Sequence, residues 1–330
     1  MKAFEYAGPA SVADALTLLG GAGSAEALSG GTDLLSRMKD YVTSPDRVVY
    51  LKDVKDLSGV KWDENVGLTI GSGTTLAEIL DHKGIKQYLP ALWQATYEVG
   101  TPQIRNMATV GGNLLQRPRC WYYRAGNGLL AVKDGKSLVR DGDNRYHAVF
   151  LTDGDALFVN PSSLAVPLIA LGAKATVAGS KGERTIALED LYQVPKKEGD
   201  RELTVASGEV LTKVLVPRGS GKNASYEARQ KQAHDWPLVM ASVNLKLDGD
   251  KVSEARVVIC GVAPIPWRSE AAEKAITGKA VTLETADAAG SAAAAGAKPL
   301  SMNGYKVALT RTVVKRALLA AVGNKYWEKG

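Results

Sequence analysis

The sequence predicts an α+β protein of three consecutive units, at residues 1–55, 56–220 and 223–330. A chain of 330 residues is longer than one simple core requires, which favours such a division. Short strand patterns alternate with amphipathic helix patterns in the first two units, and a hairpin followed by helices closes the third. Two pairs of consecutive glycines, Gly30-Gly31 and Gly111-Gly112, interrupt this pattern in what we expect to be loops.

The first unit alternates quickly between short elements. Ser11 has the side chain of a helix N-cap, and the helix after it places Val12, Ala15, Leu16 and Leu19 on one face. Apolar patterns predict strands at 2–6, 26–28 and 47–51 and a second helix at 34–38.

The second unit repeats this alternation around one long irregular segment. We expect strands at 66–70 and 173–177 and helices at 75–80, 91–98 and 165–171. Residues 117–150 are rich in Arg, Gly, Asp and Asn and show no periodicity. A loop of this length inside a domain is uncommon and usually has a function.

The third unit opens with a hairpin. Strand patterns at 243–247 and 255–260 flank Asp248-Gly249-Asp250, a strong turn signal. The Ala-rich segment 283–297 predicts a helix, and an amphipathic helix at 304–322 closes the chain.

The composition is that of an ordinary globular protein, 45% hydrophobic and 23% charged. The net charge of +6 comes from 41 basic and 35 acidic residues, and the basic residues are spread along the chain. With only 3 Phe, no basic and aromatic surface for nucleic acid is indicated. The small positive excess favours attraction of phosphates or of an acidic partner subunit.

Two cysteines, Cys120 and Cys260, lie far apart in the sequence. They indicate no disulfide framework, and the chain cannot by itself supply a four-thiolate metal site. Residues 1–6 lack the apolar core of a signal peptide, and no stretch approaches the roughly eighteen apolar residues of a membrane span. We therefore expect no classical export signal and no insertion into a membrane.

The two glycine pairs are the main candidates for a binding site. Each stands beside hydroxyl side chains, in Ser29-Gly30-Gly31-Thr32-Asp33 and in Thr109-Val110-Gly111-Gly112-Asn113. Without a Cβ, backbone N–H groups can approach an oxyanion closely, so two such loops suggest the two walls of a diphosphate cradle. Either pair alone is more simply a tight turn. The Rossmann and Walker glycine patterns are absent, since Gly71-Ser72-Gly73 lacks the third glycine.

No catalytic constellation stands out among the reactive side chains. His82, His147 and His234 are scattered and are read as surface or hydrogen-bonded core residues. Cys260 ends an apolar strand and is read as a core residue. Cys120 lies among arginines that could lower the pKa of its thiol, although a structural role is the simpler reading.

Three segments together resemble a known family. In order and spacing, 27–34 (ALSGGTDL), 101–106 (TPQIRN) and 109–114 (TVGGNL) are similar to the FAD-binding medium subunit of the molybdenum hydroxylases. That family contains xanthine dehydrogenase, carbon monoxide dehydrogenase and aldehyde oxidase, and the resemblance extends over essentially the whole chain.

Three further segments resemble one branch of this family. They are 116–122 (QRPRCWY), 144–148 (NRYHA) and 235–238 (DWPL), and they are similar to the bacterial aldehyde oxidoreductase FAD subunit.

The resemblance implies a two-part FAD-binding region of the vanillyl-alcohol oxidase type, followed by a C-terminal domain like that of carbon monoxide dehydrogenase flavoprotein. The flavin is expected between the first two units. The implied FAD contacts come from segment 27–34, the second glycine pair and three further positions: Ala27, Leu28, Ser29, Gly30, Gly31, Thr32, Asp33, Leu34, Thr109, Gly111, Gly112, Asn113, Gln116, Ser163 and Leu211.

Two departures from the family pattern matter. Where relatives carry Pro-Ser-Asp against the FAD ribose, this chain has Pro161-Ser162-Ser163, so Ser163 can form a hydrogen bond but supplies no charge. Relatives of the aldehyde oxidoreductase branch hold a [4Fe-4S] cluster with four cysteines in the long loop. This chain keeps only Cys120 there, with Leu130 and Leu138 near other ligand positions, so we expect no [4Fe-4S] cluster.

The resemblance implies an electron-transfer subunit without catalytic side chains of its own. A large subunit with the molybdenum cofactor would oxidise a substrate, in the aldehyde branch an aldehyde. A small subunit would relay electrons through [2Fe-2S] clusters to the FAD of this chain, which would pass them to an external acceptor. Alternatives are the FAD subunit of a xanthine- or carbon-monoxide-dehydrogenase-like hydroxylase, a self-contained flavin oxidase and a non-catalytic scaffold. We expect a cytoplasmic protein, or a periplasmic one co-exported with a partner that carries the signal.

Overall fold

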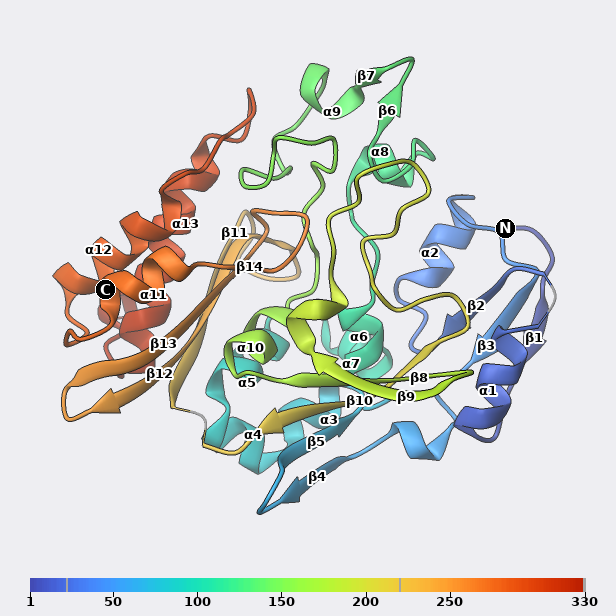
Figure 1. Ribbon diagram of the computed structural model, residues 1–330, viewed down its shortest axis with the longest axis horizontal. Helices are drawn as coiled ribbons and strands as arrows, with labels where there is room; N and C mark the ends of the chain where they lie inside the picture. The colour runs from blue at the N-terminus through green and yellow to red at the C-terminus, as the bar shows by residue number, and fades with distance from the viewer. Residues whose placement is uncertain (22, 220, 329–330) are drawn as a thin grey trace.

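The computed structural model describes residues 1–21, 23–219 and 221–328. The described residues form three larger sheets that follow one another along the chain, the last beginning at Lys222, and one small two-stranded sheet. In Figure 1 the first unit (blue) lies at one side of the molecule, the third (orange to red) lies at the other, and the second lies between them.

The first sheet is small and parallel, in the order β1-β3-β2. Its strands are β1 (Glu5–Ala7), β2 (Ala25–Leu28) and β3 (Arg47–Tyr50), with helices α1 (Val12–Leu19) and α2 (Leu34–Lys39) between them. The predicted N-cap is confirmed, because the Ser11 hydroxyl accepts a hydrogen bond from the N–H of Asp14 at 3.1 Å. The first strand begins later than predicted, at Glu5.

The second sheet is antiparallel, in the order β4-β5-β10-β8-β9. Its strands are β4 (Val60–Asp63), β5 (Gly67–Gly71), β8 (Lys174–Gly179), β9 (Gly182–Ala187) and β10 (Val210–Pro217). The helices of this unit are α3 (Leu76–Asp81), α4 (Lys83–Tyr88), α5 (Pro90–Tyr97), α6 (Pro102–Met107), α7 (Val110–Leu114) and α10 (Ala165–Ala170), and 3-10 turns lie at Lys55–Leu57 and Leu188–Leu191. The predicted helices at 75–80, 91–98 and 165–171 are confirmed to within one residue at each end.

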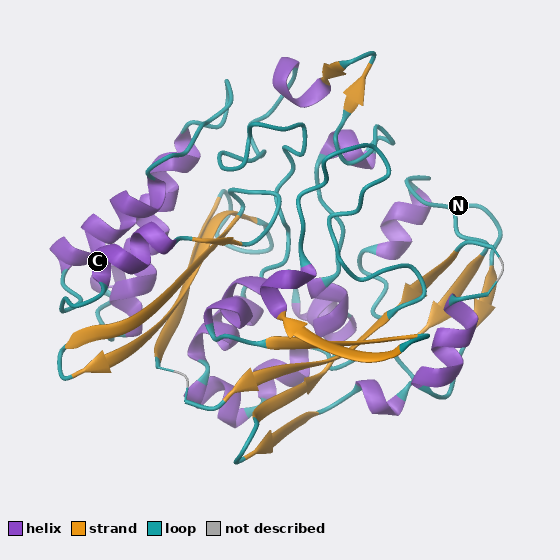
Figure 2. Ribbon diagram, viewed as in Figure 1, coloured by secondary structure: helices purple, strands orange, loops and turns teal. Residues whose placement is uncertain are grey.

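The third sheet runs in the order β11-β12-β13-β14, with all neighbours antiparallel. It consists of β11 (Lys222–Arg229), β12 (Pro237–Asp248), β13 (Lys251–Cys260) and β14 (Trp267–Arg268), followed by α11 (Glu270–Ile276), α12 (Leu283–Ala294), α13 (Tyr305–Ala321) and a 3-10 turn at Tyr326–Glu328. The hairpin turn confirms the prediction, since Asp248 pairs with Lys251 across Gly249 and Asp250. The helices pack on one face of this sheet, as Figure 2 shows.

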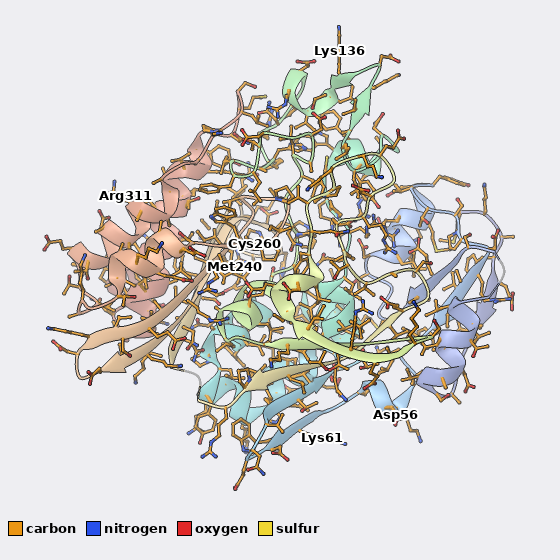
Figure 3. All side chains as sticks on the ribbon, viewed as in Figure 1. Asp56, Lys61, Lys136, Met240, Cys260 and Arg311 are labelled. Carbon is orange, nitrogen blue, oxygen red and sulfur yellow. The ribbon has the colours of Figure 1, made fainter. Side chains whose placement is uncertain are left out.

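The largest core joins the second and third units. Met240 and Cys260 are paired across β12 and β13, and both are buried in the same apolar cluster as α10. Figure 3 shows the two side chains together where the third sheet meets the second unit. Because burial of this apolar surface stabilises both units at once, the C-terminal unit is not an independently hinged module.

The segment 117–150 is more regular than its sequence suggests. It contains two short helices, α8 (Trp121–Arg124) and α9 (Leu138–Asp141), and a small hairpin of β6 (Val132–Lys133) and β7 (Lys136–Ser137). These elements are too short to show periodicity in the sequence, which is why we expected only a long loop here. Among the described residues, no helix is long and apolar enough to cross a membrane.

We expected the second glycine pair in a loop, but the structure places it within helix α7. Thr109 is the N-cap of α7, and its hydroxyl accepts a hydrogen bond from the N–H of Gly112 at 3.2 Å. Glycine is unfavourable in the interior of a helix, and for this reason the sequence pattern indicated a loop.

Candidate functional site

The two glycine pairs lie against each other in space. The hydroxyl of Thr109 donates a hydrogen bond of 2.9 Å to the hydroxyl of Ser29. A Cβ on Gly30 would lie only 2.0 Å from the carbonyl oxygen of Met107, at the end of α6. The loop after β2 and the entry to α7 therefore touch through backbone, and this contact requires glycine at position 30.

Packing within the protein also favours glycine at two further positions. A Cβ on Gly111 would lie 2.9 Å from the Cβ of Ser72, and one on Gly31 would lie 3.0 Å from a methyl group of Leu35. Gly31 also has φ +75°, a conformation that L side chains rarely adopt. At these positions the missing Cβ makes room for the protein itself. A larger side chain at Gly111 would therefore collide with Ser72.

A cavity of about 480 Å³ lies between the first two units, beside both glycine pairs. Its wall includes apolar side chains of Leu51, Leu57 and Val210. All but two of the predicted binding residues line it: Ala27, Leu28, Ser29, Gly30, Gly31, Thr32, Asp33, Leu34, Thr109, Gly111, Gly112, Gln116 and Leu211. The structure thus brings together segments that are far apart in the sequence.

The other two predicted residues, Asn113 and Ser163, line a second cavity of about 280 Å³. It adjoins the first, because Gly112 and Gln116 line both. Its far wall is the segment from His234 to Pro237, which enters β12 in the third unit. The third unit therefore contributes to the wall of the smaller cavity.

The buried side chain of Asn113 fixes the position of α7. Its Oδ1 accepts hydrogen bonds from the hydroxyl of Ser162 at 2.9 Å and from the N–H of Leu164 at 3.2 Å. The Ser162 hydroxyl in turn caps the start of α10 by accepting from the N–H of Ala165 at 3.1 Å. Asn113 is thus bonded to protein, and Ser163 beside it faces the smaller cavity.

The first glycine loop presents unused backbone donors. Within the described residues, the N–H groups of Gly30, Gly31 and Thr32 donate to no protein acceptor. In the second pair, by contrast, the N–H of Gly111 donates to Ser72 O at 2.7 Å and that of Gly112 to Thr109 Oγ1. Successive free N–H groups in a loop form an anion-binding concavity, so the first loop fits a diphosphate and the second acts as its support.

Arginines gather around Asp33 where this loop ends. The Asp33 carboxylate lies 2.7 Å from Arg124, 3.1 Å from Arg119 and 3.3 Å from Arg37. Burial raises the pKa of Asp33, but the charges of Arg119 and Arg124 outweigh this and the net pKa is lowered, so the carboxyl is ionised. Three guanidiniums share this one carboxylate, so the cluster retains an excess of positive charge. Such an excess favours the binding of an anionic ligand.

Two further ion pairs extend this arginine cluster. Arg37 also bonds Glu26 at 2.7 Å, and Arg117 bonds the buried Glu202, from which its Nη2 lies 2.9 Å. Sequence reasoning named Asp33 but missed these partners. The run Arg117-Pro118-Arg119 indicated a cluster of positive charge. The ion pairs of this cluster join four segments of the chain, so the sequence did not show its acidic partners.

Cys120 is not an activated thiol. Its Sγ lies 3.1 Å from Nε2 of His147, and burial raises the pKa of the thiol. Burial and the charge of Lys306 lower the pKa of His147 to about 4. Both groups are therefore neutral at pH 7. The possibility that the neighbouring arginines lower the pKa of Cys120 is wrong, because desolvation raises this pKa and is opposed only by hydrogen bonds from the backbone of Tyr122 and Tyr123.

The long segment is held by packing and by hydrogen bonds to the third unit. The Trp121 ring meets the rings of Tyr146 and His147 edge-on, at 5.5 and 5.6 Å between centroids. Asn303 donates to His147 O at 3.1 Å, and buried Lys306 donates to Tyr146 O at 2.8 Å. These contacts fix the segment to the third unit.

Comparison with known proteins agrees with this geometry. Residues 2–219 match the family model of the FAD binding domain in molybdopterin dehydrogenase, and residues 224–321 match the CO dehydrogenase flavoprotein C-terminal domain. The aldehyde oxidoreductase FAD-binding subunit of Escherichia coli is 28% identical over 97% of this chain and 99% of its own length. The carbon monoxide dehydrogenase medium chain of Hydrogenophaga pseudoflava is 28% identical over 96% of both chains.

The solved structures lead to the same family. Carbon monoxide dehydrogenase from Hydrogenophaga pseudoflava superposes with a TM-score of 0.76, at 27% identity over 98% of both chains. The domain matches, the relatives and the fold therefore agree over nearly the whole length of the molecule. This chain belongs to the FAD-binding medium subunits of the molybdenum hydroxylase family.

Proposed function

We propose that this chain binds FAD in the two adjoining cavities and carries electrons within a heteromeric molybdenum-containing aldehyde oxidoreductase. The observation that carries the proposal is the loop of free N–H groups at Gly30, Gly31 and Thr32, which opens onto a cavity beside surplus arginine charge. Together they fit the two negative charges of a dinucleotide diphosphate.

Each part of the cavity suits one part of the cofactor. The diphosphate would lie on the loop of Gly30 and Gly31, and the apolar wall at Leu51 and Leu57 offers a surface for an aromatic base. Ser163, which stands in the smaller cavity, would bond a ribose or ribityl hydroxyl. Bound FAD would accept electrons from a [2Fe-2S] subunit and release them to an external acceptor, and that redox chemistry belongs to the cofactor.

The role of the chain's own residues is to bind, orient and shield. The Thr109–Ser29 bond holds the two halves of the cradle at a fixed separation. Asp33 holds Arg37, Arg119 and Arg124 in place at the end of the first glycine loop. No side chain is required to act as acid, base or nucleophile. Substrate oxidation would take place in a large molybdenum-cofactor subunit, and a small iron–sulfur subunit would connect it to this chain.

The proposal of an aldehyde substrate is based on the segments 116–122, 144–148 and 235–238 and on the similarity to the aldehyde oxidoreductase subunit. Similarity to the carbon monoxide dehydrogenase medium chain is of the same degree, so a different molybdenum hydroxylase is the competing assignment. We propose that the complex works in the cytoplasm. Co-export with a signal-bearing partner is the alternative.

The test is to purify the native complex through a tag on this chain. We expect a yellow chain that carries one FAD, together with a molybdenum subunit and an iron–sulfur subunit, and a complex that oxidises aldehydes. The chain alone, loaded with FAD, should oxidise none of them. A colourless preparation with no flavin absorbance would refute FAD binding, and turnover of aldehyde by the isolated chain would instead support a self-contained oxidase.

A further inference from the structure

The smaller cavity contains one charged group whose bonds are incomplete. The Arg119 Nη2 lies 3.1 Å from Asp33 and donates to Gln116 Oε1 at 3.1 Å. Its Nε is buried and has no hydrogen-bond partner among the described residues. The Nε is closed off from the cavity, so the accessible 29% of the Arg119 side chain is the part that can meet a ligand there.

The guanidinium is held in place by an aromatic platform. Its carbon lies 4.7 Å from the ring centre of Trp236, which comes from the third unit and lines the same cavity. Cation–π stacking and the bond to Asp33 fix both the plane and the position of Arg119. A rigid cation therefore faces a space of about 280 Å³ bounded by Val99, Ile104 and the indole.

The charge of Arg119 is only partly neutralised. Asp33, its sole acidic partner within 4 Å in the described part of the chain, is shared with Arg37 and Arg124. Burial, opposed by Asp33 and reinforced by the charges of Arg124 and Arg37, lowers the pKa of Arg119 to about 10. The guanidinium is still charged at pH 7, so it attracts any negative charge that develops in the cavity.

We propose that Arg119, stacked on Trp236, raises the reduction potential of the flavin by stabilising negative charge on the isoalloxazine in the smaller cavity. This inference rests on the proposed function. Two-electron reduction with uptake of one proton leaves FAD more negative by one charge. A fixed cation beside the isoalloxazine therefore favours the reduced form over the oxidised form.

The experiment uses the full chain and measures dissociation constants for oxidised FAD and, under anaerobic conditions, for dithionite-reduced FAD. Their ratio gives the flavin potential relative to free FAD, even where binding is weakened. In Arg119→Gln we expect the preference for reduced FAD to fall at least tenfold, equivalent to about 30 mV for a two-electron couple. Arg119→Lys retains the charge and should lose less than half of this preference on the logarithmic scale.

Arg145→Gln is the matched control, because it removes one positive charge from the same segment at a half-exposed side chain outside both cavities. Its ratio should equal that of the parent. An unchanged ratio in Arg119→Gln would overturn the inference while leaving FAD binding in place. An equal decrease of the ratio in the Gln and Lys variants would show that the shape of the side chain matters and not its charge, and would overturn the inference. Equal weakening of oxidised and reduced FAD binding in Arg119→Gln would show a role in affinity alone and would overturn it too. A parent that binds neither form would refute the proposed function.

Discussion

The hydroxyl of Thr109 donates to the hydroxyl of Ser29 at 2.9 Å, across eighty residues of sequence. The same Thr109 oxygen accepts the N–H of Gly112 and thereby caps α7. One side chain thus starts the helix that supports the cradle and ties it to the loop that carries the free donors. Local helix capping and the geometry of the site are coupled through this atom.

Replacing Thr109 by valine should weaken FAD binding about tenfold, since two hydrogen bonds of about 1 kcal/mol each hold the cradle and part of their loss appears in affinity. Thr109→Ser keeps the hydroxyl and should bind nearly as the parent does. Titration of the apoprotein with FAD, followed by flavin fluorescence, measures both. Thr282→Val removes a comparable cap from α12 and serves as control. Equal weakening in both valine variants would contradict the role of the Thr109–Ser29 bond.

Gly31→Ala should lower both stability and FAD affinity. The residue has φ +75°, and an alanine held there costs about 1 to 2 kcal/mol, so the loop will shift and move its free N–H groups. Gly59→Ala is the matched control, because Gly59 has φ +102°, open space around its missing Cβ and no place in either cavity. Both variants should unfold at lower urea concentration, but only Gly31→Ala should bind FAD more weakly. Parental FAD affinity in Gly31→Ala would mean that this loop does not contact the diphosphate.

FAD should be bound without a covalent link. Among the described residues, no His or Cys lines the larger cavity. His234 lines the smaller one, and its Nδ1 lies 3.1 Å from Gly100 O. Acid precipitation of the yellow protein should release all colour to the supernatant. Colour that stays with the precipitate would disprove this, and peptide mapping would then begin at His234.

The segment 117–150 should hold no iron–sulfur cluster. A [4Fe-4S] cluster takes four thiolates, and the chain has 2 cysteines, of which Cys260 is buried in the core between β12 and α10. Iron analysis of this subunit, separated from its partners, should find none, and Cys120→Ser should leave electron transfer nearly unchanged. About four irons per chain would refute the prediction.

His147 should make the protein sensitive to mild acid. Its pKa is about 4 in the folded protein against an ordinary value of 6.5, because burial and the charge of Lys306 disfavour the imidazolium. Between these values the unfolded chain binds a proton that the folded chain does not. The contribution is therefore complete above pH 6.5 and is lost as the pH falls to 4, by on the order of 3 kcal/mol.

Urea unfolding at pH 7 and pH 4.5 measures this loss. In His147→Gln the decrease in unfolding free energy between the two pH values should be smaller than in the parent, because glutamine does not titrate. Groups that titrate independently of His147 contribute equally in both proteins, so the difference reports on His147 and its coupling to neighbouring charges. The same decrease in both proteins would show that His147 is not the group responsible.

The sequence by itself determined what depends on near neighbours. The cap at Ser11, the turn at Gly249 and the helix of 305–321 follow from local hydrogen bonding and periodicity, and the structure confirms them. The family and the residues around both glycine pairs were also readable, because they are contiguous motifs. Strand β10 was not predicted, although it lies at the centre of the second sheet, because its partners β5 and β8 are remote in sequence.

Only the tertiary structure decided the rest of the site. It showed that Gly30 touches the backbone of Met107, that the second glycine pair lies in a helix, and that Trp236 of the third unit faces Arg119 of the second. These relationships arise from packing between segments that the chain brings together on folding. A guanidinium in a sequence shows its charge, but whether that charge is paired, shared or left facing a cavity depends on which carboxylates the fold places around it.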